Sequence, residues 1–81
     1  MNKHDQFEKF FKNMLIVRSS KGLSQRESSK MADLKNLSRW ETLESGRGTP
    51  TIFEIISICK LLDQPIDSML NKECKVTIEF T

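Results

Sequence analysis

The sequence has few of the residues that metal sites and nucleophilic enzymes use. His4 is its single histidine, and its two cysteines, Cys59 and Cys74, are isolated and form no Cys-x-x-Cys pair. A zinc site or a histidine-based catalytic pair would need partners that this sequence lacks. We therefore expect no metal, no cofactor, no small-molecule ligand and no enzymatic activity, and we expect both thiols to be reduced.

Long hydrophobic runs are absent too. No stretch is long enough to span a bilayer, and the N-terminus lacks a signal-peptide pattern, so we expect a cytoplasmic protein with no membrane partner. A large excess of either charge is also missing, because 13 Lys and Arg against 11 Asp and Glu leave a net charge of +2. The basic residues are biased towards the N-terminal half, and that polarity suits a surface that faces a nucleic-acid duplex.

Composition and periodicity indicate one small helical domain. An apolar content of 37% with mixed charges favours a folded chain, and 81 residues can bury only a modest core. Five helices are expected, over residues 5–21, 25–33, 38–46, 52–62 and 65–70. The first and fourth carry apolar stripes at helical spacing, formed by Phe7, Phe10, Phe11, Met14, Leu15 and Val17, and by Ile52, Ile55, Ile56, Cys59 and Leu62. Core packing is the main interpretation of the first stripe, and a partner-binding face is the alternative.

Several expected helix ends carry sequence signals. Gly22 is suited to a left-handed cap after the first helix, and Gly46-Arg47-Gly48 ends the third. In the second helix, Met31 and Ala32 are expected to fill the inner face. Three capping-box patterns mark helix starts, namely Ser24 with Glu27, Ser38 with Glu41, and Thr51 with Glu54, while Asn36 is an alternative cap for the third helix.

The third expected helix separates apolar from polar side chains. Trp40 and Leu43 lie three residues apart and face inward, whereas Ser38, Arg39 and Thr42 share the outward face. A short helix that buries an aromatic side chain and offers Ser, Arg and Thr outward suits a DNA groove better than an active site. Arginine in particular can make a bidentate contact to guanine O6 and N7. The alternative is an exposed polar helix face with no binding role.

This region resembles the lambda-repressor-like helix-turn-helix family of the Cro/CI or XRE type. The resemblance covers roughly residues 10–71. Three departures stand out. Ser28-Ser29 replaces the usual Leu-Ala, Asp33-Leu34 replaces the usual glycine turn, and one extra residue separates Gln25 from Glu44. The matching segments are Arg18, Gly22-Leu23-Ser24-Gln25, Leu43-Glu44-Ser45-Gly46, Pro50-Thr51 and Leu62-Asp63-Gln64-Pro65-Ile66-Asp67-Ser68-Met69-Leu70.

The resemblance implies roles for individual residues. It implies a buried ion pair between Arg18 and Glu44, although an arginine at a helix end is ordinarily solvated. It also puts Gln25 on the DNA backbone, with a simple capping or turn role as the alternative. The expected base contacts come from Ser38, Arg39 and Thr42. The expected backbone contacts come from Gln25, Arg26, Lys35, Asn36, Ser45 and Arg47.

Residues 74–81 change from helical to alternating periodicity. Val76, Ile78 and Phe80 alternate with polar residues, which predicts a half-buried strand beyond a domain of residues 1–73. A lone strand needs a partner for its backbone groups, so we expect it to pair with the same segment of a second chain. The alternative is a disordered tail whose alternation is accidental.

The sequence thus predicts an all-α, five-helix, lambda-repressor-like domain with a short C-terminal β-strand. The implied function is sequence-specific double-stranded DNA binding in transcription regulation, most simply as a bacterial or phage repressor that acts as a homodimer. The alternative is an antitoxin that binds its own operator and a toxin partner. An adjacent toxin gene or a co-purifying protein would distinguish them.

Overall fold

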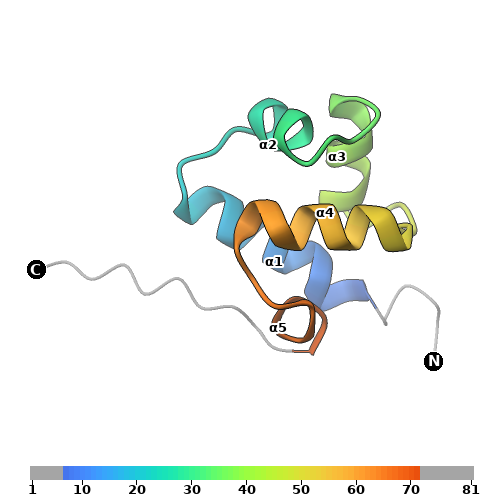
Figure 1. Cartoon of the computed structure of the whole chain (residues 1–81). Helices are drawn as coiled ribbons and strands as arrows, with labels where there is room; N and C mark the ends of the chain where they lie inside the picture. Colours follow the sequence, from blue (N-terminus) through green and yellow to red (C-terminus); the bar gives the residue numbers. More distant parts are fainter. Residues whose placement is uncertain (1–6, 72–81) are drawn as a thin grey trace, which may run out of the picture.

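A computed structural model describes residues 7–71, which form five α-helices (Figure 1). They are α1 (Glu8–Ser20), α2 (Gln25–Met31), α3 (Leu37–Glu44), α4 (Ile52–Leu62) and α5 (Ile66–Asn71). α1 contacts α3, α4 and α5, while α2 packs against α3. The five-helix prediction is therefore confirmed. The expected strand at residues 74–81, Cys74 and the first two residues of the expected first helix, 5 and 6, lie outside the described residues.

Two of the three predicted capping boxes form, and the third prediction is wrong. Glu27 N donates to Ser24 Oγ at 3.0 Å while Ser24 N donates to Glu27 Oε1 at 3.0 Å. The Thr51–Glu54 box at the start of α4 has the same two bonds. The cap of α3 is instead Asn36, the alternative that the sequence offered, whose Oδ1 accepts from the backbone N–H of Arg39 at 2.9 Å. Asn36 has the extended backbone of a cap, so the helix is already under way at the position where a serine cap was predicted.

Left-handed residues follow four of the helices, and the one after α4 is Asp63, with φ of 55°. Gly22 and Gly46 have φ of +70° and +79° after α1 and α3, as the glycine signals predicted. Asp33 has φ of 55° in the turn between α2 and α3, the place where the family usually has glycine. Aspartate tolerates this conformation better than most residues, so the turn survives the replacement.

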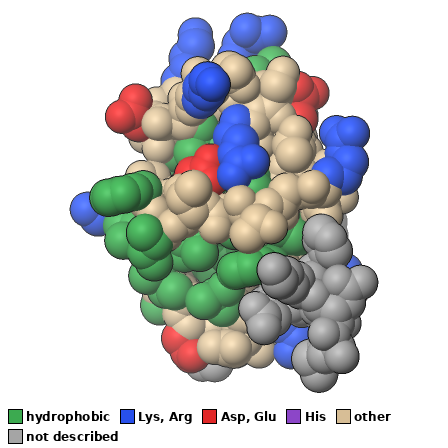
Figure 2. Space-filling view, turned by 90° about the vertical axis from the view of Figure 1, so that its right-hand side faces the viewer, with side chains coloured by type: hydrophobic (Ala, Val, Ile, Leu, Met, Phe, Trp, Pro, Cys, Tyr) green, Lys and Arg blue, Asp and Glu red, His purple; other side chains and the backbone are tan. Residues whose placement is uncertain are grey.

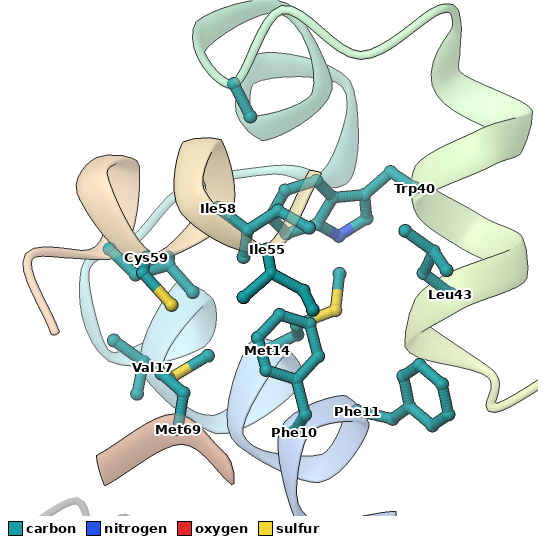
Figure 3. Packing of buried hydrophobic residues seen from close by; sticks show 12 residues of the cluster. Phe10, Phe11, Met14, Val17, Trp40, Leu43, Ile55, Ile58, Cys59 and Met69 are labelled. Carbon is teal, nitrogen blue, oxygen red and sulfur yellow. The ribbon is translucent and has the colours of Figure 1, made fainter. Parts of the chain in front are cut away.

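The core lies where α1, α3 and α4 meet (Figure 3). Trp40 and Leu43 are fully buried, as predicted, and point from α3 towards Ile58 of α4 and Phe10 of α1. Cys59 is also buried, and burial raises the pKa of its thiol. It therefore packs as a small apolar side chain rather than as a reactive group.

Four predicted core residues are exposed instead. Leu15 and Met31 are 47% and 62% exposed, and Ile52 and Ile56 of α4 are 60% and 37% exposed. Ile58, which was not predicted, is fully buried in their place. Ile55, Cys59 and Leu62 of the predicted stripe are buried as expected, so the buried face of α4 is that stripe rotated towards Ile58. Because this helix is apolar on more than one side, periodicity alone cannot tell which side is covered.

Asn13 is a buried polar residue on the apolar face of α1. Its side chain is 1% exposed, and its Nδ2 donates to the carbonyl oxygen of Met69 in α5 at 2.9 Å. The residue thus satisfies a backbone carbonyl near the end of a short helix and joins α1 to α5. Its position between Phe10 and Val17 on a helical stripe is the sequence signal that would have found it.

Ser28 and Ser29 stand side by side in α2 but differ in their hydrogen bonding. Both are buried, at 0% and 3% exposure. Ser29 Oγ donates to the carbonyl oxygen of Arg26 at 2.9 Å. Ser28 Oγ has no hydrogen-bond partner among residues 7–71. A buried hydroxyl without a partner loses its hydration and gains nothing in return.

Ser28→Ala is therefore expected to stabilise the protein by about 1 kcal/mol, because it removes a hydroxyl that is desolvated and unpaired. Ser29→Ala is the matched control, since it removes a hydroxyl that has a partner and should be less stable than Ser28→Ala by about 1 kcal/mol. Urea unfolding of both variants measures the difference. Equal stabilities, or the opposite order, would show that the Ser28 hydroxyl is satisfied in solution.

Candidate nucleic-acid interface

α2 and α3 form a helix-turn-helix at one end of the molecule (Figure 1). Residues 32–36 connect them, and Leu34 in this turn packs against the core. α3 buries Trp40 and Leu43 and turns its other face to solvent, where Ser38 is exposed and Thr42 is half-buried. The helix is thus held by one side while its polar side remains available to a partner.

The structure brings Arg18 and Glu44 together as a bidentate ion pair. Arg18 Nε donates to Glu44 Oε2 at 2.8 Å, and its Nη2 donates to Oε1 at 2.7 Å. The two side chains are only 13% and 6% exposed. A third guanidinium nitrogen, Nη1, donates to the carbonyl oxygen of Leu23 at 2.8 Å. The pair therefore ties the end of α1 to the end of α3 and to the segment before α2.

Glu44 accepts hydrogen bonds from two further side chains. Trp40 Nε1 donates to its Oε2 at 2.6 Å, and Gln25 Nε2 donates to its Oε1 at 3.1 Å. Desolvation acts to raise the pKa of Glu44, but the hydrogen bonds from Arg18 and Trp40 and the charge of Arg18 outweigh it and hold the pKa below its ordinary value of 4.5. The carboxylate is therefore ionised at neutral pH. Its hydrogen bonds with Arg18, Gln25 and Trp40 connect α1, α2 and α3.

Gln25 has a role that the sequence did not indicate. It was expected at a DNA phosphate or as a simple turn residue, whereas its amide group donates to Glu44 and so belongs to the ion-pair network. The residue remains half-buried at the first position of α2. A phosphate contact by Gln25 stays a prediction, and it would have to coexist with this internal bond or replace it.

Arg39 and Glu54 form a second ion pair, which sequence reasoning missed. Arg39 Nε donates to Glu54 Oε2 at 2.6 Å and its Nη2 donates to Oε1 at 2.7 Å. Nη2 also donates to the carbonyl oxygen of Thr49 at 2.9 Å. The hydrogen bonds from Arg39 lower the pKa of Glu54, and those to Glu54 raise the pKa of Arg39. No local pattern links two residues fifteen positions apart, so only the approach of α4 to α3 reveals the pair.

The remaining predicted backbone-contact residues fall into two groups. Asn36 uses its side chain as the cap of α3, and Ser45 Oγ donates to the carbonyl oxygen of Thr42 and accepts from Arg47 Nε. Arg26, Lys35 and Arg47 are exposed. Figure 2 looks at the side on which α3 lies, and Lys and Arg side chains line its upper edge above a hydrophobic belt. The first group shapes the helix-turn-helix, and the second offers positive charge around it.

Residues 7–71 contain no cluster of three His, Cys, Asp or Glu side chains that could hold a metal ion. Within the same residues, each helix is too short or too polar to cross a membrane.

The fold is that of the lambda-repressor-like helix-turn-helix proteins, which confirms the resemblance read from the sequence. Three solved structures illustrate it. The restriction-modification controller protein C.AhdI from Aeromonas hydrophila is 25% identical to this chain. The superposition covers 80% of this chain and 96% of C.AhdI, with a TM-score of 0.72. The hypothetical transcription factor NHTF from Neisseria is 21% identical over 89% and 82% of the two chains, with a TM-score of 0.77. The clp gene regulator ClgR from Corynebacterium glutamicum is 22% identical over 80% and 68%, with a TM-score of 0.73.

No protein-family model and no curated protein sequence matches this chain. The likeness is therefore one of three-dimensional structure.

Proposed function

We propose that this protein is a sequence-specific double-stranded DNA-binding regulator of transcription, with α3 reading the major groove. The observation that carries the proposal is the presentation of α3, which is anchored by Trp40 and Leu43 and turns Ser38 and Thr42 outward. The structural likeness to a restriction-modification controller, a transcription factor and a gene regulator supports the same function. An α-helix fits the major groove, and a helix-turn-helix uses its second helix there.

The side chains around α3 suit two kinds of contact. Ser38, Arg39 and Thr42 lie on or beside its outward face and are proposed to touch base edges. Arg26, Lys35 and Arg47 are exposed cations on neighbouring segments and are proposed to hold phosphates. We retain Gln25, Asn36 and Ser45 as backbone-contact candidates, although their side chains also make internal hydrogen bonds.

The proposal includes a homodimer. Two copies of α3 that read neighbouring half-sites must be related by a two-fold axis, at a spacing of about one turn of DNA. We assign the interface to residues 74–81, in which Val76, Ile78 and Phe80 alternate with polar residues. These residues lie outside the described part of the chain, and the assignment rests on their sequence alone.

Selection of bound fragments from random duplex DNA tests the function and supplies the operator. On the selected site, Arg39→Ala is expected to weaken binding by roughly 1–3 kcal/mol and to relax preference at one base pair. Lys35→Ala and Arg47→Ala are the controls, because loss of a phosphate contact should weaken binding to all sequences alike and reduce the salt slope by about 1. Titrations of both duplex classes at several salt concentrations measure these effects.

Two results would count against the proposal. Failure of the selection to enrich any sequence would remove the claim of specific recognition. If Arg39→Ala binds the selected site with parental affinity and parental base preference, Arg39 does not contact a base.

A further inference from the structure

The guanidinium of Arg39, proposed above to read a base, is already engaged within the protein itself. A guanidinium has five N–H groups and can present two of them in parallel along either of two edges. The edge formed by Nε and Nη2 is occupied by both carboxylate oxygens of Glu54, at 2.6 and 2.7 Å. The other edge, formed by Nη1 and Nη2, is restrained by the Thr49 carbonyl oxygen at 2.9 Å from Nη2.

The two edges are held with very different strength. The contact with Glu54 is bidentate and charge-assisted, and the two side chains are only 28% and 15% exposed. The contact with Thr49 is a single bond to a neutral acceptor. An incoming base can therefore replace the Thr49 carbonyl far more easily than the Glu54 carboxylate. The edge that remains to read DNA is the one formed by Nη1 and Nη2.

Gly48 lies directly beside Nη1. A Cβ atom at that position would lie 3.2 Å from Arg39 Nη1 and 3.2 Å from the Thr42 methyl group. The backbone of Gly48 is not left-handed, so conformational freedom does not explain the glycine. A side chain there would press on the end of the guanidinium, so glycine suits the close approach of the loop to Arg39.

We propose that Glu54 is a specificity-determining residue, which holds Arg39 so that only its Nη1–Nη2 edge is presented to guanine. This inference rests on the proposed DNA-binding function. Glu54 acts in two ways. It removes most of the rotamer freedom that a long arginine would otherwise lose on binding. It also compensates the charge of Arg39, so that phosphates of unrelated sequences attract this residue less.

The local structure of Glu54 suits this role. Its Oε1 also accepts from the backbone N–H of Thr51 at 2.8 Å, so the carboxylate is fixed by the capping box of α4 before it meets arginine. Hydrogen bonds from Arg39 hold the pKa of Glu54 below its ordinary value, so the residue is charged at neutral pH. The orientation of a side chain on α3 is thereby set by the first turn of α4.

Glu54→Gln separates the ion pair from the cap, because glutamine also serves in a capping box. We expect the ratio of affinities for the selected site and for random duplex to fall about three- to tenfold. Affinity for random duplex should rise, and its salt slope should steepen by about 1, because Arg39 becomes an uncompensated cation. The preference at the base pair that Arg39 reads should weaken.

Two controls isolate the pair. Glu27→Gln makes the same change in the capping box of α2, where Glu27 caps Ser24, and should leave the specificity ratio unchanged. In an Arg39→Ala background, Glu54→Gln should no longer alter the ratio, because the partner through which it acts is gone. A general effect of added positive charge would instead persist in that background and would appear with Glu27→Gln as well.

The outcomes separate the two claims. If the parent protein binds no duplex with sequence preference, the proposed function fails and this inference fails with it. If the parent protein is specific and Glu54→Gln has the parental specificity ratio and salt slope, this inference alone is overturned. The Arg39 Nε–H signal in NMR spectra without DNA checks the premise, since Glu54→Gln should shift it and speed its exchange with water.

Discussion

Glu44→Ala is expected to lower the free energy of unfolding by about 3–5 kcal/mol. The Glu44 carboxylate accepts hydrogen bonds from Arg18, Gln25 and Trp40, and its side chain is only 6% exposed. Its removal leaves a buried guanidinium without its counter-ion and an indole N–H without its acceptor. Urea unfolding measures the loss. Glu41→Ala is the control, because this carboxylate is exposed on the same helix.

Arg18→Ala tests the same pair from its other side. Each single replacement strands a charge, so a double-mutant cycle should show strong coupling between the two residues. Small and independent effects at both positions would mean that the ion pair does not form in solution. A loss confined to Glu44→Ala would instead assign the stabilisation to the bonds from Trp40 and Gln25.

The same carboxylate predicts how stability depends on pH. The folded-state pKa of Glu44 lies below its ordinary value of 4.5, so folding favours the ionised form. This contribution is complete above about pH 4.5 and is lost as the pH falls through the lower folded-state pKa. Glu44→Ala should therefore show a shallower loss of stability in acid than the parent protein. An identical acid dependence would show that the carboxylate has no favourable partner in the folded state.

Deletion of residues 74–81 is expected to convert the proposed homodimer to a monomer and to weaken operator binding by about 100-fold. Two linked half-site contacts bind far more tightly than either alone, because the second contact forms at high effective concentration. Sedimentation at micromolar protein measures the assembly, and titration of the two-half-site operator measures affinity. Binding to a single half-site is the control, because it should be nearly unaffected by the deletion.

A truncated protein that remains dimeric would contradict the terminal interface and direct attention to α4. Ile52 and Phe53 are 60% and 78% exposed there and follow the loop after α3, and Ile56 lies one turn further along. Phe53→Asp would then be the variant that separates the two copies. If the parent is a dimer and remains one after the deletion and after Phe53→Asp, neither residues 74–81 nor this part of α4 forms the interface.

Local signals in the sequence determined where most of the helices begin and end. The predicted bounds of α4, residues 52–62, agree with the structure, as do the capping boxes at Ser24 and Thr51 and the left-handed Gly22. These features depend on residues within one or two turns of each other. Each feature therefore needs only residues that are close together in the sequence, and it can be predicted before the fold is known. The inward pair on α3, Trp40 and Leu43, was found in the same way.

Tertiary structure decided what each helix turns towards its neighbours. α4 is apolar on several sides, and only its docking on α1 and α5 selects Ile58 for the core and leaves Ile52 exposed. The Arg39–Glu54 pair likewise joins residues on two helices that no local spacing relates. Arg18 and Glu44 were linked through a family resemblance, not through their distance in the chain. Periodicity describes one helix at a time, whereas burial and ion pairing depend on the angles at which helices pack.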